Sequence, residues 1–246
     1  MLIINGNFPL NTLFRFLFTY YSNMYSGHFA FANVIRRWYP DTPAYVLVLG
    51  VGWLDVVFAL LCCWGIEGFV EDPSAGLQGA SGFCDYSHSL FGTIVLSALY
   101  GAIFGIPGMV ASLSHWIQDW VVHNDDLFLD PFSKILLGGT NFWSRFPELA
   151  FYFEALFIVV CACAAPDARK PRTIAANAFL LALHVISRFM LPTTMKQLVS
   201  IEDDSTRYFA TGANILVAII IPVIVMSTLL QPISSSSSAE TQRKRD

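Results

Sequence analysis

Two carboxylates lie in a segment that is otherwise apolar enough to cross a membrane. Residues 146–165 read FPELAFYFEALFIVVCACAA, and the acids are Glu148 and Glu154. A charge near the centre of the hydrocarbon core costs at least about 2.5 kcal/mol, so two acids predict a polar cavity lined by protein. Burial favours the protonated form of a carboxyl group, which is the form that a general acid needs.

Asp55 is a third acid of this kind, because it lies in the apolar stretch 45–66. Around a helix, Glu148 and Glu154 point about 120° apart, so they cannot both face one point. We expect Glu154, the deeper of the two, to be the catalytic acid. Asp55 would cooperate with it, and Glu148 would be a structural partner or a second candidate for the acid.

Basic and amide side chains in a later apolar segment could complete this site. Asn177, His184 and Arg188 are spaced so that they form one stripe along a helix. An arginine inside a membrane is normally paired with a carboxylate or turned to a water-filled cavity. We therefore expect Arg188 to pair with Asp55 or Glu154, and both acids to meet this stripe in one cavity. The same pairs would also arise if they only fixed helix packing, so both interpretations stay open.

A second polar pattern, SHWIQDWVVHNDD, places His115, Asp119 and His123 on one helical face. Neutral imidazole and carboxylate are ligands that suit zinc or iron. The spacing lacks the HExxH order of metalloproteases, and Trp116 and Trp120 are typical of an aromatic belt at a membrane surface. We expect an amphipathic surface helix here, with the three polar residues as candidate metal ligands. Nothing else in the sequence indicates a cofactor.

The composition excludes several classes of protein. The chain has 246 residues, of which 55% are hydrophobic and only 13% charged, against about 25% charged in a soluble protein. The net charge is −4 and the basic residues are scattered, so no nucleic-acid partner is expected. Of the five cysteines only Cys84 lies in a loop, and we expect all of them to be small core residues, not a disulfide framework or a zinc motif.

Apolar stretches recur along the chain and predict an all-α, multi-pass membrane protein. Because positive residues favour the cytoplasmic side, the basic residues near Arg36, those near Arg169 and the basic terminus should share one side. The acidic loops near Glu67 and Glu202 should lie opposite, and this requires one extra crossing between residues 114 and 145. We therefore expect a bundle of about seven spans, with six as the alternative: 8–25, 45–66, 90–113, 127–143, 146–165, 173–191 and 208–230.

The spans would form a single helical domain, 1–232, followed by a Ser-rich, basic tail, 233–246, that we expect to be flexible. In this tail Arg243 and Lys244 resemble a dibasic signal for retrieval to the endoplasmic reticulum, although the preference for positive charge inside gives the same tail. We expect an integral, multi-pass protein of that membrane. The lipid bilayer is its expected partner, and other membrane proteins are candidate partners.

A chain of this length with short loops and isolated acids (Asp55, Glu148, Glu154) in its spans resembles the small integral membrane terpene cyclases of fungal meroterpenoid pathways, and more distantly the sterol-isomerase fold. The resemblance lies in the architecture. It implies a lyase or isomerase in which a buried acid protonates an epoxide or olefin of a lipophilic, isoprenoid-like substrate. Aromatic faces stabilise the cation that results. The candidate substrate-binding residues are Trp53, Phe151, Tyr152, Asn177 and Asn214.

A non-enzymatic membrane protein is the competing prediction. Paired acid, histidine and arginine groups also form proton relays, so a proton-coupled carrier would show the same residues. The chain lacks a visible inverted repeat, which many carriers have. A subunit of a membrane complex is the other alternative, and it would place Asp55, Glu154 and Arg188 against lipid or a partner chain.

Overall fold

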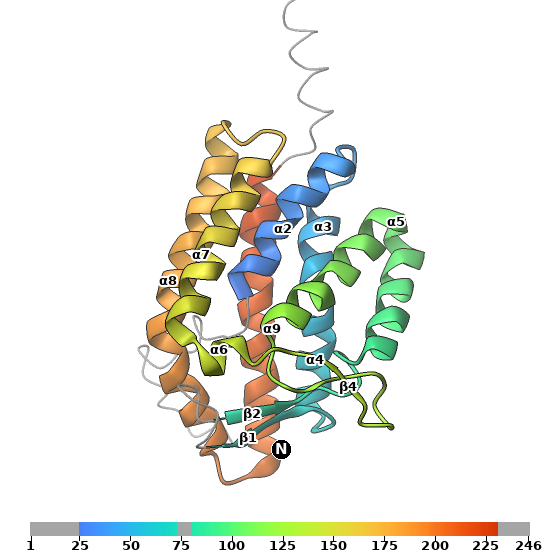
Figure 1. The fold of residues 1–246 in the computed structure, drawn as a ribbon, viewed down its shortest axis with the longest axis vertical. Helices are drawn as coiled ribbons and strands as arrows, with labels where there is room; N and C mark the ends of the chain where they lie inside the picture. The colour runs from blue at the N-terminus through green and yellow to red at the C-terminus, as the bar shows by residue number, and fades with distance from the viewer. Residues whose placement is uncertain (1–24, 73–79, 231–246) are drawn as a thin grey trace, which may run out of the picture.

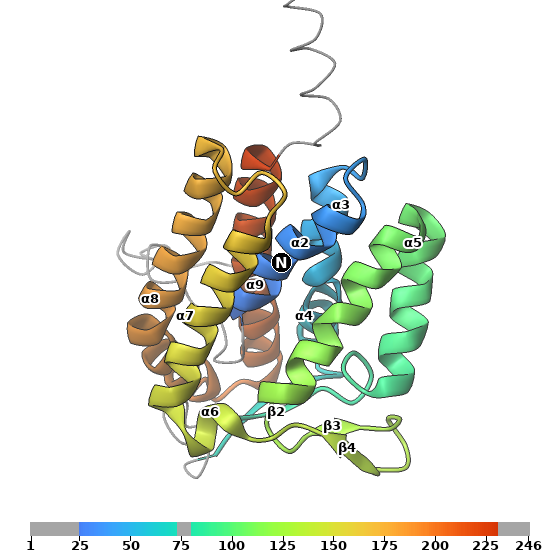
Figure 2. The same ribbon diagram turned by 45° about the horizontal axis from the view of Figure 1, so that its top comes forward.

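A computed structural model describes residues 25–72 and 80–230, which form a bundle of helices with two small β hairpins at one end (Figures 1 and 2). In chain order the elements are α2 (Tyr25–Trp38), α3 (Ala44–Val51), α4 (Trp53–Cys63), β1 (Gly68–Glu71), β2 (Ala80–Phe83), α5 (Leu90–Val122), β3 (Leu127–Phe128), β4 (Leu136–Gly138), α6 (Phe142–Arg145), α7 (Pro147–Ala164), α8 (Pro171–Val199) and α9 (Asp204–Leu229). β1 pairs with β2, and β3 with β4, each antiparallel. The prediction of an all-α fold is confirmed apart from these hairpins.

α2 lies at the centre of the bundle, where it packs against α3, α5, α7 and α8 (Figure 1). Most of its residues are buried, including the polar His28 and Asn33. A helix enclosed by protein must satisfy its polar side chains internally. Asn33 does so in part: its amide N–H donates to the side chain of Asn177 on α8 at 3.0 Å, while its Oδ1 has no partner among the described residues. This enclosure allows α2 to carry His28 into the interior.

α3 and α4 are the two halves of the predicted span 45–66, broken at Gly52 and bent by 55°. Gly50 shows how closely this pair approaches α5, because a Cβ at Gly50 would lie 2.6 Å from the Cβ of Ala111. Small residues let helices in membranes come together in this way. The contact fixes the end of α3 against the second half of α5.

α5 is not one straight span but a helical hairpin that reverses at Gly105 and Pro107 (Figure 2). Gly105 has φ 74° and ψ −175°, a conformation that glycine adopts readily and other residues do not. Across the two legs, Ser97 and Ser112 form a hydrogen bond at 2.7 Å. A straight helix would separate these residues by about 22 Å. The predicted bend is therefore present, but it turns the chain back on itself.

Each leg of the hairpin is too short to cross a bilayer on its own. At the ordinary helical rise, residues 90–104 extend about 22 Å and residues 106–122 about 25 Å, against about 30 Å for the hydrocarbon core. The residues beside the turn, Ile103 and Ile106, are apolar and exposed. The hairpin has the form of a re-entrant element that enters the membrane and returns.

The seven predicted spans are not found. Among the described residues, three helices (α5 counted over both of its legs, α7 and α9) are long and apolar enough to cross a membrane, or up to four if α3 and α4 make one bent span. α7 and α9 correspond to the predicted spans 146–165 and 208–230. α8 covers the predicted span 173–191 but is not among these helices. The predicted first span, 8–25, lies outside the described residues apart from Tyr25, and so does the tail.

The predicted crossing at 127–143 is wrong, because this stretch forms β3, β4 and part of α6 at one end of the bundle (Figure 2). Asp130 begins a tight turn: its carboxylate accepts hydrogen bonds from the backbone N–H groups of Phe132 and Ser133, both at 2.8 Å. Lys134 then adopts a positive φ of 52°. Asp, Pro and Ser are typical turn residues, and here they prevent a continuous helix.

As the charges predict, the basic stretches near Arg36 and Arg169 lie at one end of the bundle and the loop near Glu67 lies at the other. Arg36 at the end of α2 pairs with Asp167, in the loop between α7 and α8, at 3.1 Å, so the two basic stretches lie at one end of the bundle (Figure 1). At the other end β1 packs against α8 and α9. The charge bias requires an even number of passes between residues 67 and 145. The α5 hairpin meets this requirement without any crossing, because it returns the chain to the end of the bundle from which it started.

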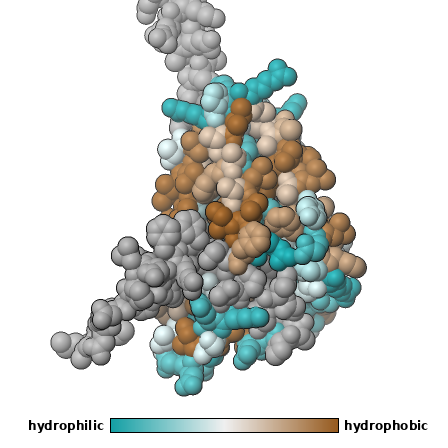
Figure 3. All heavy atoms as spheres, turned by 90° about the vertical axis from the view of Figure 1, so that its left-hand side faces the viewer, coloured by the Kyte–Doolittle hydropathy of each residue, from teal (hydrophilic) through white to brown (hydrophobic). Residues whose placement is uncertain are grey.

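The outer surface of α7 shows why this helix suits a membrane. Leu149, Leu156 and Val160 are exposed, whereas Glu154 and Ile158 on the opposite side are buried. A helix that is apolar on its exposed face as well as its buried face is typical of a membrane span. On this side of the molecule, hydrophobic residues gather in the middle and hydrophilic ones toward both ends (Figure 3). These are the features of an integral membrane protein.

The hairpin in α5 predicts a specific disulfide. When Ser97 and Ser112 are both replaced by cysteine, mild oxidation should link them within one chain, because their hydroxyl oxygens lie 2.7 Å apart. Mass spectrometry of the digested protein identifies the linked peptides. The control pair, Ser97→Cys with Ile117→Cys, lies more than one turn further along the second leg and should not link. If α5 were straight, both pairs would stay unlinked.

Candidate metal centre

Five polar side chains from four segments meet in the interior: His28, Asp55, His88, His115 and Asp119, which we call the histidine cluster. The reversal of α5 explains the meeting, because His88 lies just before the first leg and His115 and Asp119 lie near the end of the second. α2 contributes His28, and the first turn of α4 contributes Asp55. All five side chains are buried.

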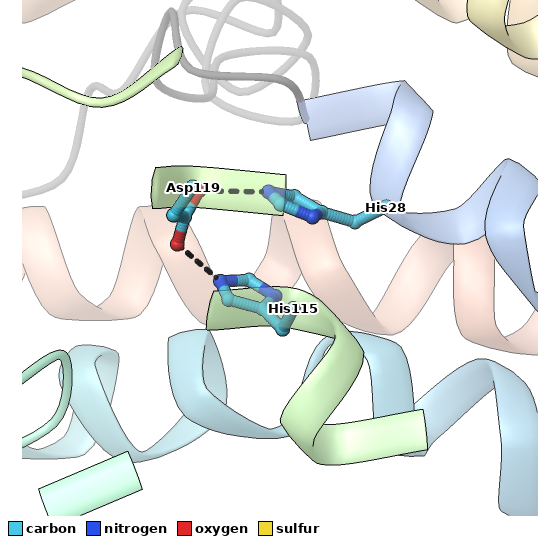
Figure 4. A group of neighbouring side chains, drawn as sticks. All are labelled: His28, His115 and Asp119. Atoms are coloured by element: carbon cyan, nitrogen blue, oxygen red, sulfur yellow. Dashed lines mark ion pairs between the residues drawn. The ribbon is translucent and has the colours of Figure 1, made fainter. Parts of the chain in front are cut away.

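Asp119 lies beside two stacked imidazole rings and reaches both with its carboxylate (Figure 4). Its Oδ1 lies 3.1 Å from Nε2 of His28, and its Oδ2 lies 3.0 Å from Nε2 of His115. The two rings are stacked with 3.9 Å between their centroids. Oδ2 also lies 3.6 Å from Nε2 of His88, yet it accepts no well-formed hydrogen bond from the described residues. This oxygen is therefore close to two ring nitrogens that do not satisfy it.

Hydrogen bonding fixes which nitrogen of His115 carries the proton. Nδ1 lies 2.6 Å from the carbonyl oxygen of Val51, and a carbonyl only accepts, so Nδ1 must donate. In neutral His115, Nε2 is then left with a lone pair. It faces Oδ2 of Asp119 at 3.0 Å, Oδ1 of Asp55 at 3.7 Å and Nε2 of His88 at 3.3 Å. Electron pairs that face one another in this way repel unless a proton or a metal cation lies among them.

The histidine cluster fits a divalent transition metal. It contains two overlapping groups that share His115, and within each group the ligand atoms lie within 4.8 Å of one another. The two carboxylates balance the charge of one divalent ion, and imidazole with carboxylate suits zinc, iron or manganese. Metal-ligating histidines usually donate their other ring N–H to a carbonyl or carboxylate, as His115 does here. The groups are His28, His115 and Asp119, and Asp55, His88 and His115.

A buried carboxylate holds the turn that presents His88. Oε1 of Glu67 accepts hydrogen bonds from the backbone N–H groups of Tyr86 at 2.6 Å and Ser87 at 2.9 Å. Burial raises the pKa of Glu67, although these hydrogen bonds act to lower it. The Ser87 hydroxyl lies 2.7 Å from Nδ1 of His88, which leaves Nε2 to face Asp55 at 3.5 Å. Glu67 thus anchors a ligand of the cluster from a different loop.

A second group of potential ligands, Cys84, His123 and Asp126, lies next to the cluster and is called the Cys84 triad here. Burial lowers the pKa of His123, but the attraction of Asp126 and the hydrogen bond to it raise the pKa to about 9. Burial raises the pKa of the Cys84 thiol, and nearby carboxylates, Asp126 first, raise it further. The ring of His123 stacks on that of His88, with 5.9 Å between centroids.

The three candidate ligands that the sequence placed on one helical face are divided between these groups. His115 and Asp119 belong to the histidine cluster, and His123, just beyond the end of α5, belongs to the Cys84 triad. All three are buried, so the expected surface helix is wrong. Trp116 donates from its indole N–H to the carbonyl of His88 at 2.8 Å, which gives it a structural contact in place of a purely interfacial one.

Glu154 and His184, two of the predicted catalytic residues, do meet. Oε1 of Glu154 accepts a hydrogen bond from the backbone N–H of Gly27 at 2.8 Å, and Oε2 lies 3.3 Å from Nδ1 of His184. Nε2 of His184 donates to the carbonyl of Phe151 at 3.0 Å. The pair therefore ties α7 and α8 to the beginning of α2, one residue before His28.

The other predicted pairings are wrong. Arg188 pairs with Glu148, whose side chain is 71% exposed, and not with Asp55 or Glu154. Glu148 is near the beginning of α7, within reach of the long arginine side chain, so the ion pair forms outside the interior. Asp55 belongs to the histidine cluster, whereas Glu154 pairs with His184. The structure therefore has two separate polar groups, the histidine cluster and the Glu154–His184 pair, where the sequence predicted one cavity.

The predicted substrate-binding residues lie on four different helices. Trp53 of α4 donates from its indole N–H to a carbonyl of the first leg of α5, at 3.2 Å. On α7, Phe151 stacks against a histidine ring, with 4.4 Å between centroids, while Tyr152 is exposed. Asn177 and Asn214 are buried on α8 and α9. Their role in binding a substrate stays a prediction.

Sequence reasoning missed His28 and His88 of the cluster, and Cys84 and Asp126 of the triad. One signal was available, because the chain has only five histidines and they border or interrupt apolar stretches. A second signal was the turn itself. His88 and His123 lie almost equally far from Gly105 along the chain, so a hairpin at that glycine brings them together.

The contacts of Glu154 predict how two glutamates respond to replacement by glutamine. Glu154→Gln should lower the free energy of unfolding in detergent by about 1–3 kcal/mol, because the neutral amide removes the carboxylate charge that pairs with the protonated ring of His184 at 3.3 Å. Glu148→Gln should change it by less than about 0.5 kcal/mol, as expected for an exposed pair. Chemical denaturation followed by tryptophan fluorescence measures both. Equal effects of the two variants would contradict the structural role of Glu154.

Comparison with known proteins adds no family to this description. No family model matches the chain, and neither a curated protein nor a solved structure matches it. The resemblance to small membrane terpene cyclases therefore stays a prediction. The function has to be argued from the chemistry of the histidine cluster.

Proposed function

We propose that the protein is a membrane-embedded metalloenzyme that hydrolyses a lipophilic substrate. One observation carries the proposal. With Nδ1 of His115 held by the carbonyl of Val51, Nε2 faces two carboxylates and a second imidazole nitrogen, and in the neutral ring its lone pair is free to bind a metal ion. A divalent cation is what such a set of buried electron pairs binds, and the two negative charges match it.

The ligand set suits hydrolysis. A divalent ion held by histidine and carboxylate acts as a Lewis acid and lowers the pKa of a bound water to about 7. The cluster offers more ligand atoms than a four-coordinate ion with a bound water needs, so one carboxylate is free to act as general base. Asp55 suits that role, because its Oδ1 lies 3.5 and 3.7 Å from the nearest ring nitrogens. Asp119 lies closer to its own, at 3.0 and 3.1 Å, and suits a ligand.

The position of the cluster favours a substrate with a long apolar part. The tip of the α5 hairpin is apolar and exposed at Ile103 and Ile106, whereas the open end carries the exposed aromatic residues Trp120 and Phe132. Aromatic residues are enriched at the depth of the lipid headgroups. The cluster is near the open end, at the level where a lipid presents its polar linkage. An ester or phosphoester with an acyl or isoprenoid chain fits this position.

Acid-initiated chemistry on an isoprenoid substrate, as in membrane terpene cyclases, is the second candidate. Glu154 favours it, because this carboxyl group is only 2% exposed and its partner His184 stacks against Phe151. In that case Glu154 would supply the proton and His184 would position it. The two candidates make opposite predictions for Glu154 and Asp119.

We further propose the endoplasmic reticulum as the location. The basic pair Arg243 and Lys244 supports it. The end of α9 lies at the same end of the bundle as the loop between α7 and α8 (Figure 1), where Arg169 and Arg172 are found. The preference for positive charge inside would place that end of the bundle in the cytosol.

Metal content tests the proposed hydrolase first. After purification and dialysis, His115→Ala and Asp119→Asn should each hold about one divalent ion per chain fewer than the wild-type protein, because each removes a ligand. His184→Gln, which changes a buried histidine outside the cluster, is the control and should keep its metal. Elemental analysis by mass spectrometry gives the number of ions. A full complement of metal in His115→Ala, or none in the wild-type protein, would refute the metal centre.

Hydrolysis by the same detergent-solubilised proteins tests the reaction. A series of p-nitrophenyl esters of increasing chain length, with bis(p-nitrophenyl) phosphate, covers both proposed linkages. Asp55→Asn should keep most of its metal and lose about 10²- to 10⁴-fold in rate, as expected for a general base, and a chelator should stop the wild-type enzyme. Glu154→Gln should retain activity. The reverse pattern, with Glu154→Gln inactive and Asp119→Asn active on isoprenoid substrates, would support the second candidate instead.

A further inference from the structure

Three potential metal ligands lie at the open end of the α5 hairpin and take no part in the histidine cluster. Cys84 precedes the first leg, and His123 and Asp126 follow the second. Their ligand atoms lie within 4.8 Å of one another. We propose that the Cys84 triad binds a second divalent metal ion, of the zinc type, that closes the open end of the hairpin. This inference rests on the triad itself and does not depend on the proposed hydrolase.

Backbone hydrogen bonds hold the triad in place. The carbonyl of Cys84 accepts from the N–H of His88 at 3.0 Å. The N–H of His123 donates to the carbonyl of Asp119 at 2.7 Å, and the carbonyl of His123 accepts from Asn141 at 2.8 Å. The ligands are therefore ordered by the fold before any ion binds, which reduces the entropy that binding costs.

The triad has one buried oxygen whose hydrogen-bonding capacity is not used. Nδ1 of His123 donates to Oδ1 of Asp126, whereas Oδ2 of Asp126 is buried and has no hydrogen-bond partner among the described residues. An unsatisfied buried carboxylate oxygen is costly. A metal ion would satisfy it. On binding, the Cys84 thiol and the protonated ring of His123 each release one proton to water, so that thiolate and carboxylate together neutralise one divalent ion, with neutral imidazole as the third ligand.

The ligand types distinguish this ion from the one in the histidine cluster. The cluster offers only nitrogen and oxygen, whereas the triad adds a sulfur, and thiolate selects zinc over magnesium or calcium. The ring of His123 packs on that of His88, with 5.9 Å between centroids. An ion in the triad would therefore join the two ends of α5 and fix a ring that packs on the cluster. Its role is structural.

X-ray absorption at the zinc edge tests the second site, because sulfur and nitrogen neighbours lie at different distances from the ion. Zinc-loaded wild-type protein should show a sulfur shell at about 2.3 Å beside nitrogen or oxygen at about 2.0–2.1 Å. Cys84→Ser should lose this sulfur shell and one zinc ion per chain. Cys62→Ser, which changes another buried cysteine, is the matched control and should keep both.

Two further variants separate this test from the hydrolase proposal. His115→Ala should lose the ion of the histidine cluster and keep the sulfur shell, so a failure of the first centre does not affect this result. Asp126→Asn should weaken zinc binding at the triad roughly 10- to 100-fold, and it provides a second test if Cys84→Ser does not fold. Absence of a sulfur shell in the zinc-loaded wild-type protein, or an unchanged shell in Cys84→Ser, overturns the proposal.

Discussion

The hydrogen bond from Nδ1 of His115 to the carbonyl of Val51 joins the two irregular helices on which the site depends. It requires α3 to end at Gly52 and α5 to turn back at Gly105. With Nδ1 engaged, Nε2 is left to face Asp119. Burying polar groups is costly unless they are paired, and both breaks in the helices bring such groups together.

Broken and re-entrant helices are a common way for membrane proteins to place polar groups in the interior. In this protein the break between α3 and α4 puts Asp55 in the first turn of α4, and the hairpin brings the ends of α5 together at His88 and Asp119. α2 adds His28 because other helices enclose it. The straighter helices α7 and α9 provide length and apolar surface. The regular helices α7 and α9 thus provide the apolar surface that suits a bilayer, whereas the broken α3–α4 pair and the α5 hairpin position the polar side chains of the site.

Hydrophobic pattern predicted the regular helices well and the irregular ones poorly. The stretches 146–165 and 208–230 are nearly uninterrupted apolar runs, and both are helices. The meeting of Glu154 with His184 followed from the cost of leaving either against lipid. The reversal at Gly105 could not be predicted, because a Gly–Pro–Gly pattern fits a bend as well as a hairpin. Without that reversal, the residues before α5 seem distant from those at its end, so His88 was missed and Asp55 was not expected beside His115 and Asp119.

The position of a bound metal ion relative to His115 tests the account most directly. Anomalous scattering at the absorption edge of the ion, recorded from crystals of metal-loaded protein, locates that ion independently of any assay. The account predicts a peak about 2.0–2.2 Å from Nε2 of His115 and at a similar distance from a carboxylate oxygen of Asp119. A map with no peak in the histidine cluster, or with a peak only beside Glu154 and His184, would contradict it.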